Sequence, residues 1–451
     1  MAGLGKRVAA PPRQRCGGVA DLGMGFILIG TFERFGERYP LVLSAEARRQ
    51  HLYVVGKTGT GKSTLLKSLL VQDIEAGRGC GVIDPHGDLA EELLGQIPRR
   101  RTDDVVYFDP GDLEHPVAFN PIEAVPPDER HLIARGVVAA CEHLWAESWG
   151  PRLAYVLHNA VAALLDATAR YGGQTLLGVP RLLVDEEFRR RITGAIENPK
   201  VRQFWMEEFP GYGTRLAAEA IAPVQNKVGQ FLTSPVLRNI LGQPRSTIRP
   251  SEIMEEGRIL IANLANGKLG EEDTNLLGSL LVTSFQLAAM RRAAIPETER
   301  RDFHLAIDEF HSFTTDAFTG IFAEARKYRL ALTVAHQYLD QVGKGVQAAI
   351  FGNVGTLLAF RVGAEDARRL AREFVPYTAE TLTDLSRGEI CVRPLVGGEV
   401  RQPFLALTAQ APLRTAGRRE NMRIQSQTRY GRPRAAVEDK IARWIQGRRM
   451  P

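Results

Sequence analysis

Cysteine is scarce in this chain, and the few cysteines are widely spaced. Only four occur in 451 residues: Cys16, Cys80, Cys141 and Cys391. No two of them have the spacing of a disulfide framework or a zinc site. Long hydrophobic runs are also missing, since no stretch approaches the roughly 18 unbroken apolar residues of a membrane helix. The N-terminus shows no signal-peptide cleavage pattern. These absences predict a cytoplasmic protein with no transmembrane segment of its own.

Positive charge is concentrated at one end of the sequence. Residues 412–451 contain eleven Lys or Arg and three acidic residues, a net charge of +8, so the rest of the chain sums to −2 of the total of +6. A basic terminal arm is a common feature of nucleic-acid-binding proteins. The alternatives are a solvated tail or an arm that docks on an acidic partner. The segment shows no convincing apolar period, so we expect the fold to survive without it.

The strongest functional signature lies in residues 56–64, GKTGTGKST, which match the P-loop pattern GxxxxGK[ST] at every fixed position. An apolar run at 52–55 precedes the loop and a helix-like run at 65–70 follows it. In such a loop the glycines let successive N–H groups point at phosphate oxygens, and the helix N-terminus adds positive potential. We expect Lys62 to reach the outer phosphates of ATP and the Ser63 hydroxyl to bind Mg²⁺. The residues predicted to bind the nucleotide are Gly56, Lys57, Thr58, Gly59, Thr60, Gly61, Lys62, Ser63 and Thr64.

The predicted elements alternate between strand and helix on both sides of a purely helical stretch, which indicates an α/β protein with a mostly parallel sheet and an inserted all-α domain. The predicted strands are 26–32, 41–43, 52–55, 80–84, 105–108, 259–264, 305–307, 330–334, 356–360, 389–392 and 403–407. The long helices predicted between the two halves are 131–144, 153–167, 186–196 and 217–231.

Five segments follow from this pattern. They are a basic N-terminal leader with short strands at 1–45, the first part of the ATPase domain at 46–125, the inserted all-α domain at 126–250, the second part of the ATPase domain at 251–410, and a basic C-terminal tail at 411–451.

A second motif, residues 303–309 (FHLAIDE), has the apolar run ending in two acids that a Walker B strand needs. Asp308 would then hold the coordination shell of Mg²⁺ through water, and Glu309 would orient or deprotonate the attacking water. A GTPase interpretation is weaker. Residues 84–87 fit the DxxG of a switch, but residues 226–229 (NKVG) end in Gly where a guanine-reading carboxylate is needed, and they fall in the helical stretch.

Together, the motifs at 56–64, 82–88 (VIDPHGD), 307–309, 324–327 (EARK) and 335–337 (AHQ) resemble those of the HerA/FtsK superfamily. Within it the chain is most similar to the conjugative coupling proteins of type IV secretion (the TraD/TraG type), over roughly residues 45 to 410. The resemblance implies a RecA-like P-loop fold and a ring, usually a homo-hexamer, with ATP at subunit interfaces and DNA through the centre. It also implies relaxase or secretion-channel partners and attachment to the inner membrane through partners. Many coupling proteins start with membrane helices, which this sequence lacks.

Two further residues take roles from this resemblance. Gln337 matches the family's γ-phosphate sensor, and its alternative is an ordinary hydrogen bond at a strand end. Arg326 matches an arginine proposed to reach a neighbour's nucleotide, with Arg361 as the second choice. Because Lys327 and Arg329 adjoin Arg326, a solvated basic helix face is its alternative. We expect Glu309, Lys62, Gln337 and Arg326 to form the catalytic set.

The leading hypothesis is an ATP-hydrolysing ring motor that translocates DNA in conjugative transfer. One alternative is a HerA-like translocase serving repair or phage defence. Another is an ATP-regulated adaptor that recruits relaxase-type cargo. Stimulation of ATPase activity by DNA separates the motor from the adaptor.

Overall fold

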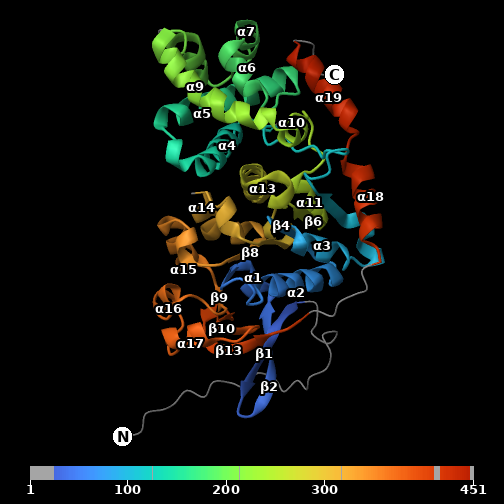
Figure 1. Cartoon of the computed structure of the whole chain (residues 1–451), viewed down its shortest axis with the longest axis vertical. Coiled ribbons are helices and arrows are strands. Elements are labelled where there is room, and N and C mark those ends of the chain that lie inside the picture. The colour runs from blue at the N-terminus through green and yellow to red at the C-terminus, as the bar shows by residue number, and fades with distance from the viewer. Residues whose placement is uncertain (1–24, 124, 213, 316, 411–416, 447–451) are drawn as a thin grey trace.

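The computed structural model describes residues 25–123, 125–212, 214–315, 317–410 and 417–446. Residues 1–24 of the expected leader, which include Cys16, lie outside this part. The molecule is elongated, with a β-hairpin at one end, a helix-covered sheet in the middle and a group of helices at the other end (Figure 1). None of the helices in the described ranges combines the length and apolarity needed to cross a bilayer.

The central feature of the described residues is one sheet of eleven strands in the order β2-β1-β13-β10-β9-β3-β8-β7-β4-β6-β5. The first four strands in this order are β2 (Glu37–Ser44), β1 (Phe26–Arg34), β13 (Phe404–Thr408) and β10 (Glu389–Arg393). The seven strands from β9 to β5 are parallel, and the other four pair antiparallel. This arrangement confirms the predicted mostly parallel α/β sheet. In sheet order the parallel strands are β9 (Thr356–Ala359), β3 (Leu52–Val55), β8 (Leu330–His336), β7 (Phe303–Ile307), β4 (Gly79–Asp84), β6 (Ile259–Asn263) and β5 (Val105–Phe108).

Side chains of the parallel strands alternate between two cores, one on each face of the sheet, as the period of a strand requires. In β3, Leu52 and Val54 pack into one core, whereas Tyr53 and Val55 pack into the other. The first core includes residues of α2 and α3, and the second includes residues of α13, α14 and α15 and continues into the helical end. These helices are α2 (Lys62–Glu75), α3 (Asp88–Leu94), α13 (Glu271–Arg291), α14 (Ala317–Glu324) and α15 (Lys344–Asn353).

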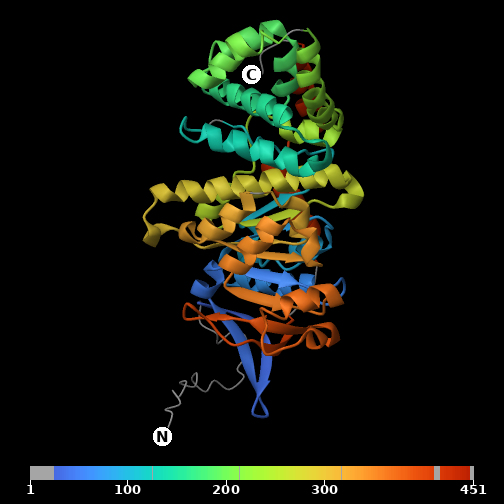
Figure 2. The same cartoon turned by 90° about the vertical axis from the view of Figure 1, so that its left-hand side faces the viewer.

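The helical end is formed by the chain between β5 and β6, where the described residues contain no strand. Figure 2 shows these helices stacked on α13, beyond the sheet. All four predicted long helices have counterparts, although several ends differ by a few residues. The elements are α4 (Arg130–Leu144), α5 (Pro151–Tyr171), α6 (Gly178–Val184), α7 (Glu186–Thr193), α8 (Pro199–Gln203), α9 (Thr214–Thr233) and α10 (Pro235–Leu241).

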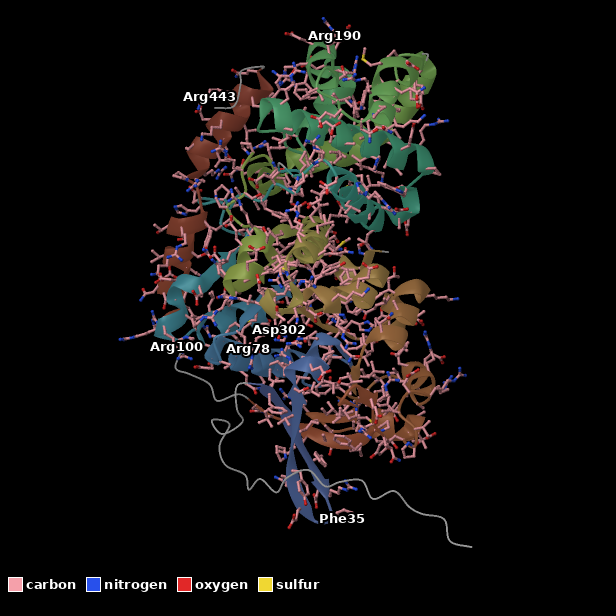
Figure 3. The ribbon with its side chains drawn as sticks, turned by 180° about the vertical axis from the view of Figure 1, so that it is seen from behind. Phe35, Arg78, Arg100, Arg190, Asp302 and Arg443 are labelled. Carbon is pink, nitrogen blue, oxygen red and sulfur yellow. The ribbon has the colours of Figure 1, made fainter. Side chains whose placement is uncertain are left out.

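At the opposite end, β1 (Phe26–Arg34) and β2 (Glu37–Ser44) form a hairpin that projects from the body, with Phe35 at its tip (Figure 3). Phe35 and Gly36 both have positive φ angles, 55° and 74°, which suits the tight primed turns that join twisted strands. The hairpin joins the sheet through pairing of β1 with β13 (Phe404–Thr408), which in turn pairs with β10 (Glu389–Arg393). The two short predicted strands near the N-terminus are therefore confirmed, and both are longer than expected.

The C-terminal segment corrects an expectation. Residues 417–446 are not a stretch without an apolar period, because they form α18 (Arg419–Tyr430) and α19 (Arg434–Ile445). These two helices run along one side of the molecule and bridge the sheet and the helical end (Figure 1). Within each helix the buried side chains recur every three or four positions: Met422, Ser426 and Tyr430 in α18, and Val437, Ile441 and Trp444 in α19. The many intervening arginines hide this period when the sequence is judged by composition.

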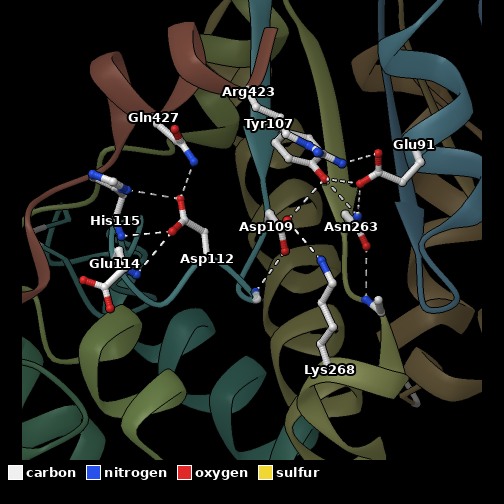
Figure 4. A network of polar contacts seen from close by, with 12 residues as sticks. Glu91, Tyr107, Asp109, Asp112, Glu114, His115, Asn263, Lys268, Arg423 and Gln427 are labelled. Carbon is white, nitrogen blue, oxygen red and sulfur yellow. Dashed lines mark hydrogen bonds and ion pairs between the residues drawn. The ribbon is translucent and has the colours of Figure 1, made fainter. Parts of the chain in front are cut away.

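Helix α18 covers the edge strand β5. Ser426 Oγ accepts a hydrogen bond from the Tyr107 N–H at 2.9 Å and donates one to the Tyr107 carbonyl at 3.2 Å. Both polar groups of Tyr107 on the open edge of the sheet are thereby satisfied. Figure 4 shows the neighbouring contacts, in which Arg423 reaches Glu91 and Gln427 Nε2 donates to Asp112 at 2.7 Å. The C-terminal helices are thus part of the fold.

We expect deletion of residues 417–451 to destabilise the protein. Removal of six buried side chains and of the cover on β5 should lower the free energy of unfolding by at least ~3 kcal/mol, given ~1.5–3 kcal/mol for each fully buried large apolar side chain. Thermal and urea unfolding measure this change, and deletion of residues 447–451 alone is the control. An unchanged melting temperature for the longer deletion would contradict the docked arrangement.

Candidate active site

The loop between β3 and α2 has the backbone that phosphate binding needs. Gly59 and Gly61 have φ angles of 77° and 122°, which side-chain-bearing residues rarely adopt. At Gly56 an added Cβ would lie 2.5 Å from the Cβ of Phe360. Neighbouring segments hold the loop in place, because the Lys57 N–H donates to the Arg361 carbonyl at 2.8 Å and the Gly388 N–H donates to the Thr60 carbonyl at 3.0 Å. Lys62 is the first residue of α2, so the loop leads directly into a helix N-terminus.

Lys62 is buried at the base of this loop. Its ammonium donates to the carbonyls of Gly56 at 2.7 Å and Lys57 at 3.3 Å. Burial lowers the pKa of Lys62, and the nearby Glu309 and Asp308 carboxylates oppose that effect. The ammonium therefore lies between the loop and two acids, a position suited to binding phosphate oxygens.

Ser63 and Asp308 meet across the sheet edge although 245 positions separate them in the sequence. The Ser63 hydroxyl donates to Asp308 Oδ2 at 2.8 Å. Asp308 follows β7 and is almost fully buried, and this burial raises its pKa in spite of the Ser63 hydrogen bond, with the Glu309 charge adding to the rise. A divalent cation would relieve this confined negative charge, and hydroxyl and carboxylate oxygens are the ligands that Mg²⁺ prefers. The pair fits the predicted magnesium site.

No group of three or more potential His, Cys, Asp or Glu ligands occurs among the residues that the structure describes. A bound Mg²⁺ would thus depend on substrate phosphates and water for its remaining ligands, as is usual for this ion.

Glu309 has an unusual backbone conformation. Its φ and ψ angles are 43° and 48°, in the left-handed region, which costs a non-glycine residue about 1–3 kcal/mol. Its side chain is buried, and Gln337 Nε2 donates to Glu309 Oε1 at 2.9 Å. Gln337 follows β8, which lies between β3 and β7 in the sheet. The ends of three adjacent parallel strands thereby bring the P-loop, the acidic pair and the amide together.

The two candidate arginines lie at opposite ends of the parallel strands, Arg326 before the start of β8 and Arg361 after the end of β9. Arg326 is exposed on a 3-10 turn, Ala325–Tyr328, that precedes β8. Since β8 has seven residues, Arg326 lies roughly 20 Å from the edge that carries Gln337, at about 3.3 Å per residue. Within one chain, therefore, Arg326 does not join the P-loop. Arg361 is also exposed, but it follows β9 and its carbonyl binds the P-loop residue Lys57.

Asp84, which fixes the conformation of a turn beside the site, was not among the predicted site residues. Asp84 at the end of β4 is buried, and its carboxylate accepts hydrogen bonds from the N–H groups of His86 and Ala90, both at 2.9 Å. Burial raises the pKa of Asp84 against these two bonds. Asp84 thus fixes the turn between β4 and α3 next to the Walker B strand. The motif at 82–88 marked this position, but a carboxylate that caps its own turn has no separate sequence signature.

The amino-acid sequence was compared with protein families and with curated proteins. Residues 28–135 match the family model of the central domain of the helicase HerA. No curated protein gives a significant sequence match to the chain.

Solved structures extend the similarity over most of the chain. The plasmid coupling protein TrwB in complex with ADP and Mg²⁺ matches with a TM-score of 0.62 and 16% identity, over 92% of this chain and 99% of that one. TrwB with a non-hydrolysable ATP analogue matches with a TM-score of 0.58 and 16% identity, over 82% and 87%. VirB4 of Thermoanaerobacter pseudethanolicus matches with a TM-score of 0.57 and 16% identity, over 88% and 99%. At these identities the likeness shows a shared fold. The predicted RecA-like fold is thereby confirmed, and the chain resembles the HerA central domain over residues 28–135 and TrwB and VirB4 in fold.

Proposed function

We propose that the chain is a Mg²⁺-dependent ATPase that works as a ring motor and translocates DNA in conjugative transfer. The observation that carries the proposal is the convergence of Lys62, Ser63, Asp308, Glu309 and Gln337 at one edge of the parallel sheet. This set supplies the functions that phosphoryl transfer to water needs, namely phosphate binding, a cation site, a base and a group that can contact the outer phosphate.

Each residue has a distinct part in this proposal. The loop N–H groups and Lys62 bind the phosphates, while Ser63 and Asp308 hold Mg²⁺, which when bound neutralises phosphate charge. Glu309 accepts a proton from the attacking water, whose oxygen forms a bond to the terminal phosphorus while the bond from that phosphorus to the bridging oxygen breaks, so that phosphate and ADP are released. Gln337, one hydrogen bond from Glu309, reports the presence of the γ-phosphate. Arg326 acts on the nucleotide of a neighbouring subunit.

The assignment to DNA transport rests on the motif resemblance and on the fold shared with TrwB. TrwB is described both as a bacterial conjugative coupling protein and as a plasmid coupling protein. We propose a homo-hexamer with DNA in its centre, cytoplasmic and attached to the inner membrane through secretion-channel or relaxase partners. The match to the HerA central domain favours a HerA-like translocase in repair or defence as the second candidate.

Most cations of the C-terminal helices are paired within the chain and are therefore poor candidates for DNA contacts. The ion pairs of α18 and α19 are Arg423 with Glu91, Arg429 with Asp103, Arg434 with Glu114 and Glu438, and Arg443 with Asp439. Arg432 and Lys440 form no ion pair with a described residue. Together with Arg245 and Arg249, they line a cavity of about 420 Å³ where the C-terminal helices meet the loop after α10. We propose that the nucleic-acid contact of this segment lies here.

The triple variant R245A/R432A/K440A should bind DNA more weakly, with a flatter dependence of log K on log salt. Each lost phosphate contact should change that slope by roughly 0.9 on duplex DNA. Binding titrations over a salt series measure the slope. Arg443→Ala is the matched control, because it removes one cation of α19 that is already paired and does not line the cavity. Equal slopes for the triple variant and the wild type would move the DNA contact elsewhere.

The function itself is tested by ATPase rates without DNA, with single-stranded DNA and with duplex DNA, together with the native mass. The motor predicts hydrolysis that DNA stimulates in a protein able to form rings. Hydrolysis that ignores DNA but responds to a relaxase-type protein would favour the adaptor, and absence of hydrolysis under all conditions would refute the ATPase assignment.

A further inference from the structure

The proposed base Glu309 and three neighbouring residues, Gln337, Gln341 and His311, form a ring of polar contacts. Gln337 Nε2 donates to Glu309 Oε1 at 2.9 Å, and the Gln337 N–H donates to Gln341 Oε1 at 3.0 Å. Gln341 Nε2 lies 3.2 Å from His311 Nε2, and His311 Nδ1 lies 3.5 Å from Glu309 Oε2. The ring joins the segment after β7 to the segment after β8. Neither His311 nor Gln341 belongs to the motifs by which the sequence predicts the site.

The direction of the hydrogen bonds in this ring is determined by its chemistry. Gln341 Oε1 accepts from two backbone N–H groups, those of Gln337 and Tyr338 at 3.0 and 3.1 Å, so the amide nitrogen must face His311. An amide nitrogen only donates, and His311 Nε2 must therefore be an unprotonated acceptor. The imidazole is neutral, because burial lowers the pKa of His311 to about 4. Its proton is then on Nδ1, which faces the carboxylate of Glu309.

The longest contact in the ring joins His311 Nδ1 to Glu309 Oε2, and neither atom has another hydrogen-bond partner among the described residues. Both atoms are buried. A buried carboxylate oxygen and a buried N–H at 3.5 Å can satisfy each other after a small approach or through one water. Glu309 needs such support, because its left-handed backbone would otherwise be free to relax. Its charge also acts on Lys62, so the ring holds the carboxylate beside the phosphate-binding ammonium.

We propose that His311 and Gln341 are positioning residues of the ATPase site, which hold the Glu309 carboxylate in its orientation through the ring Glu309–His311–Gln341–Gln337. This inference rests on the proposed ATP hydrolysis. Neither residue contacts the substrate in this proposal. Gln341 fixes the imidazole tautomer, His311 directs its Nδ1–H at one carboxylate oxygen, and Gln337 binds the other. When the Gln337 amide turns to the γ-phosphate, the His311 contact alone keeps Glu309 aimed at the water.

The central experiment compares three substitutions in the full chain. His311→Ala removes the Nδ1–H donor and should lower kcat for ATP by roughly 10- to 100-fold while KM changes little, since a misplacement of about 1 Å can cost about 100-fold in rate. His311→Asn places an amide N–H near the former Nδ1 and should recover part of this loss. Gln341→Glu keeps the acceptor for the two backbone N–H groups but removes the donor to His311, and it should lower kcat less than His311→Ala. His115→Ala, at an exposed histidine after β5, is the control with unchanged kcat.

The outcomes separate this inference from the proposed function. If the wild type hydrolyses ATP and His311→Ala stays within twofold of its kcat, the ring has no positioning role. The same conclusion follows if Asn and Ala at position 311 lower kcat equally at unchanged melting temperature. If the wild type does not hydrolyse ATP, the proposed function fails, and the ring is still tested by ¹⁵N chemical shifts of the His311 imidazole. A proton on Nδ1 supports the ring, and a proton on Nε2 overturns it.

Discussion

Glu309→Gln should retain ATP binding and lose hydrolysis, whereas Lys62→Ala should lose binding itself. The difference follows from the role that we propose for each group, Lys62 in binding phosphates and Glu309 in activating water. Lys62 offers an ammonium to phosphates in the ground state, and a charge-assisted hydrogen bond is worth roughly 1.5–3 kcal/mol, so its removal should weaken binding at least about tenfold. Glu309 acts on the water, and loss of general base catalysis should reduce kcat by ~10²–10⁴. Equilibrium binding of a fluorescent ATP analogue and steady-state hydrolysis measure the two effects.

Glutamine is the sharper substitution at position 309, because an amide oxygen can still accept the hydrogen bond from Gln337 Nε2. The other carboxylate oxygen becomes an NH₂ group that faces His311 Nδ1, and an equal melting temperature would show that the left-handed backbone tolerates this change. Hydrolysis by Glu309→Gln near the wild-type rate would show that Glu309 is not the base. The Walker B assignment would then rest on Asp308 alone.

The sequence predicts those parts of the site that depend on a fixed motif spacing or on the regular geometry of parallel strands. A P-loop has a fixed spacing, and parallel strands carry their carboxyl ends to one edge, so Lys62, Ser63 and Asp308 were expected to meet. The structure places them together, with Ser63 and Asp308 in direct contact. The same topology places Arg326 at the opposite edge, because its turn precedes a strand of the sheet and does not follow one.

The parts that the sequence does not predict depend on contacts between distant segments. Pairing of β1 with β13 joins residues near 30 to residues near 408, and strand propensity says nothing about such a partner. The apolar period of the C-terminal helices is difficult to recognise in the sequence because many arginines lie between the buried positions. Several of these arginines form ion pairs with acids of the sheet domain and of α19 itself. His311 and Gln341 become meaningful only once β7 and β8 lie side by side.

Arg326→Ala should leave ATP binding nearly unchanged and abolish most hydrolysis in the assembled ring. The exposed guanidinium lies at the sheet edge opposite its own P-loop, so in the proposed ring it would act on a neighbour's nucleotide. An arginine supplied in trans stabilises the charge on the transferred phosphoryl group, and in GTPases it is worth about 10³–10⁵ in rate. Lys327→Ala is the matched control, since Lys327 is exposed on the same turn and should tolerate replacement.

Mixing experiments decide whether the site is shared between subunits. Arg326→Ala subunits keep an intact P-loop and Lys62→Ala subunits keep an intact arginine, so mixed rings should contain some complete sites and recover part of the activity. Arg361 supplies the contrast, because it lies beside the P-loop of its own chain through the Lys57–Arg361 backbone bond. Arg361→Ala and Lys62→Ala therefore both damage the site formed by the P-loop of their own subunit. Mixing these two variants should restore no ATPase activity. If Arg326→Ala and Lys62→Ala co-assemble by native mass spectrometry and still show no recovery at any ratio, Arg326 is not a residue of the neighbouring site, and its turn is a solvated basic surface.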